Sequence, residues 1–388
     1  MKKIILLSII TSSIIHATNG DNLIALGPES RAMGGTGIAY GMGADSVFKN
    51  PAWLVDSKGL NGMFGATVFM PDVSASNAGQ GNGQSATSKA DMNLIPEIAI
   101  TDHISNDLSY GFGMFGVSGM GVDYRNEDPM KGLSSMRTNL QYMRFVPSIS
   151  YATGDWRLGA GITLSYGSLA MSAMTPDGTA DPMTMAQRGG GTSEDYGFGA
   201  QIGVGYYLSN EITLGAYYQT QVDTEYENVF DFNADGMYDS LKLSQPAEYG
   251  LGIAYVRSNY GLTFDYRKIA WSSADGYDRF MWDDQDVFAL GFSYEVADLT
   301  LRAGYNYSEN PLSNVSTQDP QSAYFNIMGF PAFSESHYTA GFGYQLNERL
   351  CLDFAYVNSP EVTESYNGAF EASNGQNSIT VAMHYTID

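Results

Sequence analysis

Cysteine, histidine and basic side chains are all scarce in this chain. It holds one cysteine, Cys351, and four histidines among 388 residues. A single cysteine excludes a disulfide framework. The histidines have no cysteine or histidine partner at metal-site spacing, and the sequence contains neither a nucleophile–base pair nor a phosphate-binding glycine loop. The composition therefore points to neither an enzyme nor a metalloprotein.

The charge balance and the apolar pattern narrow the class further. The chain has 19 basic against 42 acidic side chains and a formal net charge of −23, which argues against nucleic acid as a partner. No apolar run after Ala17 has the length of a membrane-spanning helix. Aromatic residues reach 13%, with 27 tyrosines, whereas charged residues reach only 16%. Abundant tyrosine with few charges is typical of a membrane β-barrel with aromatic girdles.

The first residues have the pattern of a secretory signal peptide. Met1-Lys2-Lys3 precedes a short apolar run, and a small residue, Ala17, follows it. We expect residues 1–17 to be removed by cleavage after Ala17. The alternative is an N-terminal anchor helix, for which the apolar run is short compared with the about 20 residues that span a bilayer.

From residue 59 onward, apolar side chains alternate with small or polar ones. In the run Trp156 to Tyr166, Trp, Leu, Ala and Ile fall on one face, and Arg, Gly and Thr fall on the other. The pattern recurs along the chain, and many runs end on tyrosine, which suits a membrane interface. We therefore predict an all-β fold in which residues 59–388 form a transmembrane antiparallel barrel of about fourteen strands.

The connections between the predicted strands alternate between short and long. An even number of strands with short turns on one side places both chain ends at the periplasmic face. The long loops, expected on the outside, are residues 71–91, 120–138, 171–194, 228–243, 270–284, 308–336 and 360–375.

The stretch from Gly27 to Leu54 fits neither a strand nor a linker. It is too rich in glycine for a regular element and too apolar for a solvated linker. A compact segment of this kind needs a container, so we predict that residues 18–58 form a plug inside the barrel. Its key residues are Arg31, Gly34, Gly35, Asn50, Pro51 and Ala52.

Several segments together resemble the FadL family of outer-membrane transporters for long-chain fatty acids and related hydrophobic compounds. They are Asn50-Pro51-Ala52, the strands 246–255 and 301–307, and the closing pair 338–344 and 352–356. The resemblance covers nearly the whole chain after Ala17 and implies a fourteen-stranded barrel closed by an N-terminal hatch. The chain lacks the terminal aromatic residue that is usual in such barrels, because it ends on Ile387-Asp388.

Two predicted outer loops carry segments that are more apolar than solvated loops, residues 169–174 with 182–185 in one and residues 324–333 in the other. We expect them to capture substrate, with methionine suiting flexible ligands; the alternative is that they pack only on each other. Phe115, an aromatic residue on the third predicted strand, completes the set of candidates. The predicted substrate-binding residues are Phe115, Arg144, Met171, Met174, Met183, Met185, Phe325, Ile327, Met328, Phe330 and Phe333.

Alternation turns Arg144, Arg157, Arg267 and Arg302 toward the lumen. Each is expected to pair with a lumen carboxylate or with the plug. Arg144 is the best candidate to bind a ligand carboxylate instead.

The third predicted strand, 108–121, is dense in glycine, which is typical of bulges and kinks. The resemblance implies a kink there that opens the wall toward lipid. The predicted kink residues are Gly111, Gly113 and Gly116. The alternative is that these glycines make room for the plug.

Residues 231–239 have the D-x-N-x-D-G spacing of a calcium loop, with Asp231, Asn233, Asp235 and Asp239 as candidate ligands. The glutamate expected three residues further on is replaced by Lys242. The possibilities are therefore a structural calcium ion in an extracellular loop or an acidic surface turn.

We conclude from the sequence that the protein is a non-enzymatic channel of the bacterial outer membrane. It is expected to take up long-chain fatty acids passively, with aromatic or alkane hydrocarbons as the alternative substrate and a diffusion porin or a structural barrel as the alternative class. No cofactor is required. Expected partners are outer-membrane lipid, lipopolysaccharide, the barrel-assembly machinery and a hydrophobic small molecule, with the protein acting as a monomer and without nucleic acid.

Overall fold

The computed structural model describes residues 18–176 and 184–387. Within these residues, fourteen long antiparallel strands form the wall of one barrel. They are β3 (Leu60–Asn77), β5 (Asn93–Ser105), β6 (Leu108–Met120), β7 (Arg137–Thr153), β8 (Trp156–Pro176), β9 (Met185–Tyr207), β10 (Ile212–Gln219), β13 (Glu248–Arg257), β14 (Tyr260–Ile269), β15 (Gln285–Val296), β16 (Leu299–Ser308), β17 (Ser336–Asn347), β18 (Leu350–Tyr366) and β19 (Phe370–Ile387). The predicted fold class and strand number are confirmed.

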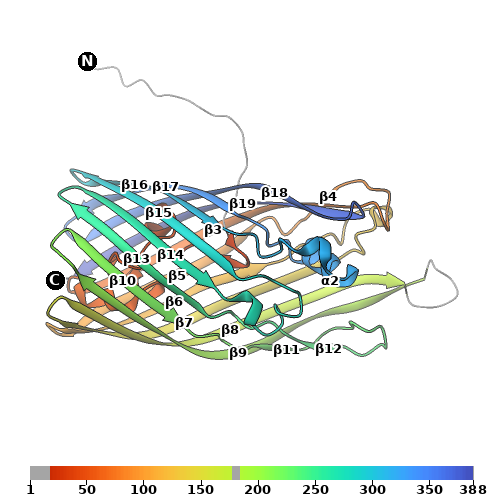
Figure 1. Ribbon diagram of the computed structural model, residues 1–388, viewed down its shortest axis with the longest axis horizontal. Helices are drawn as coiled ribbons and strands as arrows, with labels where there is room; N and C mark the ends of the chain where they lie inside the picture. Colours follow the sequence, from red (N-terminus) through yellow and green to blue (C-terminus); the bar gives the residue numbers. More distant parts are fainter. Residues whose placement is uncertain (1–17, 177–183, 388) are drawn as a thin grey trace, which may run out of the picture.

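The last strand closes the barrel by pairing with the first. The β19–β3 ladder runs from Ile387 opposite Leu60 to Phe370 opposite Asn77. Neighbouring strands otherwise follow the chain, with β10 passing directly to β13. Figure 1 shows the resulting elongated barrel, with the strands inclined to its long axis. This closure pairs the first and last strands with each other, so neither β3 nor β19 is left as a free sheet edge in the wall.

Side chains alternate across the wall as the sequence pattern predicts. On β14, Leu262 and Phe264 are 45% and 44% exposed on the outer face, while the alternating residues Thr263 and Asp265 are buried toward the lumen. The same alternation on the other strands builds a continuous apolar outer belt. Such a belt is stable in hydrocarbon and is the surface of a transmembrane barrel.

Short turns join the strands at one end of the barrel, and long connections lie at the other end together with the short helix α2 (Figure 1). Two predicted loops were wrong. Residues 171–176 and 185–194 continue the β8–β9 ladder, residues 360–375 largely continue the β18–β19 ladder, and residues 177–183 lie outside the described residues. The pairing of their own backbones, rather than loose loop structure, satisfies their hydrogen-bonding groups.

The plug lies inside the barrel, toward the end with the short turns (Figure 1). Its elements are β1 (Thr18–Asn19), β2 (Asn22–Leu23), α1 (Pro28–Ala32), η1 (Gly43–Phe48) and η2 (Pro51–Asp56). Most of its residues are buried. Residues 1–17, the predicted signal peptide, lie outside the described residues.

The long connections carry the remaining elements. These are β4 (Ala86–Thr87), η3 (Pro129–Lys131), β11 (Glu225–Phe230), β12 (Asp239–Lys242), η4 (Trp271–Ser273), η5 (Val315–Thr317), α2 (Pro320–Tyr324) and η6 (Phe325–Gly329). Apolar side chains of these connections form a large buried cluster that includes Trp271, Trp282 and Phe333. None of the helices in the described ranges is long and apolar enough to cross a membrane.

Candidate functional site

Asn50 joins the plug to the wall. Its side-chain amide donates to the carbonyl oxygens of Ile38, at 2.7 Å, and of Val204 on β9, at 3.1 Å. Its Oδ1 accepts from the backbone N–H of Ala52 at 3.1 Å and so caps η2. Pro51 occupies the first position of this helix, where its missing N–H costs nothing. One side chain thus holds two plug segments and a strand together.

Arg31 and the Gly34-Gly35 pair hold the middle of the plug. Arg31 forms an ion pair with Glu97 of β5, and both side chains are fully buried. Gly34 donates to Thr339 Oγ1 at 2.9 Å and has a positive φ of 71°. A Cβ there would lie 2.6 Å from the carbonyl oxygen of Tyr305, so only glycine fits against this part of the wall.

Glycines on the inner face of the wall make room for the plug in turn. A Cβ added at Gly203 of β9 would lie 1.9 Å from Asn50 Oδ1, and one at Gly215 of β10 would lie 2.0 Å from the carbonyl oxygen of Ile38. The high glycine content of the strands therefore follows from close contact between the plug and the barrel.

The wall opens between β5 and β6. Their ladder runs from the short turn as far as Glu97 opposite Phe115 and ends there. Beyond that point β5 stays paired with β3 as far as Asn93, and β6 stays paired with β7 as far as Met120. The register of β6 on β7 shifts between Gly116 and Ser118, which bends β6 away from its neighbour.

The predicted kink glycines have two different roles. Gly116 lies at the bulge, and a Cβ there would be 2.7 Å from Ile95 Cγ2 on β5. Gly111 and Gly113 are regularly paired with both neighbours instead. A Cβ at these positions would meet Leu54 and Val47 of the plug, as the alternative interpretation expected.

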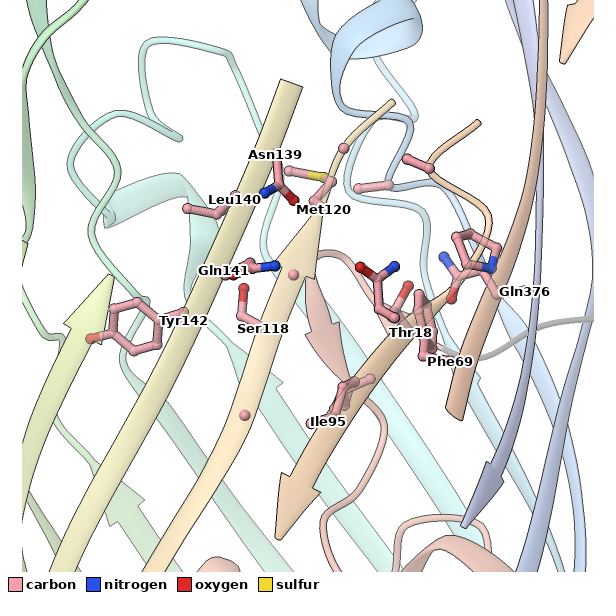
Figure 2. Close-up of a pocket in the computed structure, with 18 of the residues that line it drawn as sticks. Thr18, Phe69, Ile95, Ser118, Met120, Asn139, Leu140, Gln141, Tyr142 and Gln376 are labelled. Atoms are coloured by element: carbon pink, nitrogen blue, oxygen red, sulfur yellow. The ribbon is translucent and has the colours of Figure 1, made fainter. Parts of the chain in front are cut away.

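A cavity of about 200 Å³ lies just inside this opening. Figure 2 shows Ile95 of β5 on one side of it, Ser118 and Met120 of β6 on the other, and Thr18 of the plug facing them. Leu23, Phe69, Leu140 and Tyr142 contribute apolar surface, and several amide side chains contribute polar groups. Its lining residues, all within the described chain, include no charged side chain. The sequence did not predict these lining residues. The alternation of apolar and polar side chains predicts which face of a strand points into the barrel, but not which two strands separate.

The predicted capture residues divide between an outer cavity and a packed core. Met171 and Phe325 line a cavity of about 160 Å³ among the long connections, together with Phe230, Phe232 and Tyr324. The two apolar segments predicted from the sequence therefore do meet.

The other predicted substrate-binding residues are not part of either cavity lining. Ile327, Met328, Phe330 and Phe333 are buried in the outer apolar cluster, where they pack on neighbouring connections. Phe115 packs edge-to-face on Phe48 of the plug, with ring centroids 4.3 Å apart. Met174 and Met185 lie on the extended β8–β9 hairpin, half-buried and 43% exposed respectively, and Met183 lies outside the described residues.

Three of the four lumen arginines have carboxylate partners. Arg302 bridges Asp353 and Glu29 of the plug, Arg157 pairs with Asp56 of the plug, and Arg267 pairs with Glu248. Arg144 differs from them. Its Nη1 donates to Gln219 Oε1 at 2.6 Å, and no carboxylate of the described residues lies within ion-pair distance.

Arg144 also borders a small cavity of about 40 Å³ with Lys49, Arg267 and Glu248. Leu23 lines both this cavity and the larger one inside the wall opening.

The calcium-like turn joins β11 and β12. Asp231 forms an ion pair with Arg188 of β9 and accepts from the backbone N–H of Gly236, while Asp239 accepts from that of Phe232. In the ranges that the structure describes, no three histidine, cysteine or acidic side chains are arranged to hold one metal ion. The ion pair of Asp231 with Arg188 favours the acidic surface turn, and calcium binding here stays a hypothesis for a titration to test.

A closed barrel with an apolar belt, an internal plug and a cavity at a wall opening defines an outer-membrane channel protein. The model of the outer membrane protein transport protein family (OMPP1/FadL/TodX) matches residues 21–386. The chain belongs to this family, and the resemblance seen in the sequence is confirmed. The protein is located in the bacterial outer membrane. The homologues are transport channels rather than enzymes.

Two solved structures share the fold. The Pseudomonas putida toluene transporter TodX is 21% identical, with a TM-score of 0.74 over 95% of this chain and 100% of that one. A Pseudomonas aeruginosa FadL homologue is 17% identical, with a TM-score of 0.76 over 95% of this chain and 100% of that one.

One curated protein of Chlorobium limicola also matches. It is described as an uncharacterized protein in the phosphoenolpyruvate carboxykinase gene 5′ region and is 39% identical over 101 residues, 26% of this chain. The chain spans 50% of the length of that relative.

Proposed function

We propose that this protein takes up hydrophobic small molecules passively across the outer membrane. The observation that carries the proposal is the cavity that ends at the wall opening between β5 and β6. Substrate first adsorbs in the outer cavity beside Phe325, then moves to the inner cavity, and leaves sideways into the lipid past Gly116. No covalent chemistry and no energy source take part.

The uncharged lining favours neutral, compact molecules as substrates. A dry apolar cavity of about 150 Å³ accepts benzene, and the cavity here measures about 200 Å³. A monoaromatic hydrocarbon therefore fits without leaving a buried charge unpaired, which would be costly. TodX, which shares this fold, is a toluene transporter, and this supports the same class of substrate here.

Long-chain fatty acids are the second candidate, and Arg144 is the observation that favours them. Its guanidinium is buried, borders the small cavity and lacks a carboxylate among the described residues. A fatty-acid carboxylate would pair with Arg144 while its alkyl chain passes Leu23 into the larger cavity. Charge-assisted bidentate pairing suits arginine for this role.

Uptake by a deletion strain distinguishes the two candidates. Cells with and without the protein are given labelled toluene or labelled palmitate, and the variant Arg144→Met is compared with the wild-type protein. We expect toluene uptake to depend on the protein and to be unchanged in Arg144→Met. Palmitate uptake that depends on the protein and falls at least tenfold in Arg144→Met would support the fatty-acid candidate instead. Equal uptake of both compounds with and without the protein would refute transport altogether.

The proposal implies further partners. The barrel would fold with the barrel-assembly machinery, lie among outer-membrane lipid and lipopolysaccharide, and act as a monomer because its inner cavity and its exit lie within a single chain. A diffusion porin is disfavoured, because the plug fills the lumen where a porin would hold water.

A further inference from the structure

Toward the short turns, the wall opening ends at the last rung of the β5–β6 ladder. Two plug residues contact this rung from inside the barrel. The last rung of the β5–β6 ladder joins Glu97 and Phe115. Arg31 of α1 forms its ion pair with Glu97, and Phe48 of η1 packs on Phe115. The next residue of β5, Pro96, has no N–H with which to continue the ladder. The opening therefore begins at the rung that the plug holds.

Glu97 is tied to the plug more completely than to the wall. Its Oε2 accepts from the backbone N–H of Gly27 at 3.1 Å, in addition to the ion pair with Arg31, while its wall contact is Thr67 Oγ1 at 3.5 Å. Both partners from the plug lie in α1 or directly before it. If α1 moves away from β5, Glu97 is left as a buried carboxylate without its cation and without its backbone donor.

The ion pair is poorly suited to a purely stabilising role. Both side chains are fully buried, and Arg31 Nε and Nη1 have no hydrogen-bond partner among the described residues. A buried pair with unsatisfied donors is rarely worth more than an apolar contact of the same size, whereas removal of one partner is strongly destabilising. Such a pair suits a switch that must hold two parts together in one state and release them in another.

We infer that the Arg31–Glu97 pair couples the position of the plug to the wall opening. Arg31 and Glu97 position the last rung of the β5–β6 ladder and do not contact substrate. With the pair formed, the ladder is closed up to Glu97; when α1 withdraws, the last rungs separate and the opening extends toward the short turns. Plug movement and lateral exit are then one event. This inference rests on the proposed function, because it assumes that the opening serves as the exit.

Amide hydrogen exchange of the purified barrel in detergent tests this coupling. The wild-type protein is compared with Arg31→Met and with the isosteric Glu97→Gln, and exchange is followed in residues 96–101 and 112–117. We expect exchange there to rise about tenfold or more in both variants, because a buried ion is left unpaired. The conservative variant Arg31→Lys keeps the charge and should retain much of the protection.

Arg302→Met is the matched control. Arg302 also bridges the wall and α1, through Glu29, but it lies on β16, which is not a neighbour of β5 or β6 in the barrel. Because this variant leaves Arg31 and Glu97 in contact, it should leave exchange in residues 96–101 at the wild-type rate. Equal acceleration by Arg302→Met, or wild-type exchange in both Arg31→Met and Glu97→Gln, would overturn the coupling. Toluene uptake is measured in a separate experiment. Failure of the proposed function is then seen as a lack of protein-dependent uptake, whatever the exchange result says about the coupling.

Discussion

The plug should be loosened by removal of the Asn50 side chain. Asn50→Ala removes four hydrogen bonds: one accepted from Ala52 N–H, and three donated to the carbonyl oxygens of Ile38, Val204 and, at a long 3.4 Å, Ala216. The Ile38 carbonyl keeps its bond from Trp53 Nε1 at 2.8 Å, so the main loss is the buried N–H of Ala52 and the bridge to β9. An unsatisfied buried donor costs about 1–3 kcal/mol, and each lost bond to a carbonyl costs about 0.5–1.5 kcal/mol.

The unsatisfied Ala52 donor and the lost bond to Val204 together lower the stability of the docked plug by about 1.5–4.5 kcal/mol. At about 1.4 kcal/mol per factor of ten, the population of the opened plug rises roughly 10- to 1500-fold. Hydrogen exchange followed by mass spectrometry measures this directly as faster exchange in residues 28–56, with β14 as an internal reference. Asn50→Ser keeps an acceptor for Ala52 N–H but cannot reach Val204, so it should fall between wild type and Asn50→Ala.

The contact between Asn50 and the wall can also be tested by substitutions in β9. Gly203→Ala would place a Cβ 1.9 Å from Asn50 Oδ1, whereas Gly191 on the same strand has nothing within 4 Å. Gly203→Ala should therefore loosen the plug, and Gly191→Ala should not. Plug exchange at the wild-type rate in Asn50→Ala, or a joint rise of plug and β14 exchange, would show that Asn50 does not hold the plug in place.

Three further predictions concern other parts of the molecule. Burial raises the pKa of Asp21, in the plug, to about 6. Its contribution to plug docking is thus present in full below about pH 4 and is lost as the pH rises through about 6. The protection factors of residues 18–24, taken relative to the intrinsic exchange rate at each pH, should therefore rise as the pH falls through this window, and Asp21→Asn should abolish that rise. Calorimetric titration with millimolar calcium should release no heat, because Arg188 already pairs with Asp231; heat that disappears in Asp231→Asn would contradict this. Phe325→Ala enlarges the outer cavity and should lower the rate of toluene uptake at low substrate concentration several-fold, while uptake at saturating concentration stays near the wild-type value.

The barrel was predictable because its signals are local and repeated. Alternation such as that around Leu262 and Phe264 follows from the two-residue period of a strand facing lipid on one side. The plug was predictable because Gly27 to Leu54 is apolar without a regular period. The paired residues 171–176, 185–194 and 360–375 were predicted to be loops, because strand pairing beyond the membrane needs no apolar face.

The inner site was less predictable, because it depends on where two particular strands separate. Glycine density along β6 indicated an irregular strand but did not distinguish Gly116, at the opening, from Gly111 and Gly113, under the plug. The cavity lining comes from strands far apart in sequence, such as Ile95 and Leu140, and no local pattern marks it. Arg144 could be proposed from alternation, but its lack of a carboxylate among the described residues is a tertiary fact.

A reversible disulfide across the opening tests the central claim of lateral exit most directly. An ideal Cβ at Gly116 lies 3.9 Å from Ile95 Cβ, within the range of about 3.5–4.5 Å that a disulfide requires. The pair Ile95→Cys and Gly116→Cys is made with Cys351→Ser, and a control staple joins the regularly paired Ile100 and Phe112 below the opening. We predict that oxidation of the Ile95–Gly116 pair lowers toluene uptake at least tenfold and that reduction restores it, with the control staple without effect. Wild-type uptake through the oxidised Ile95–Gly116 protein would contradict lateral exit.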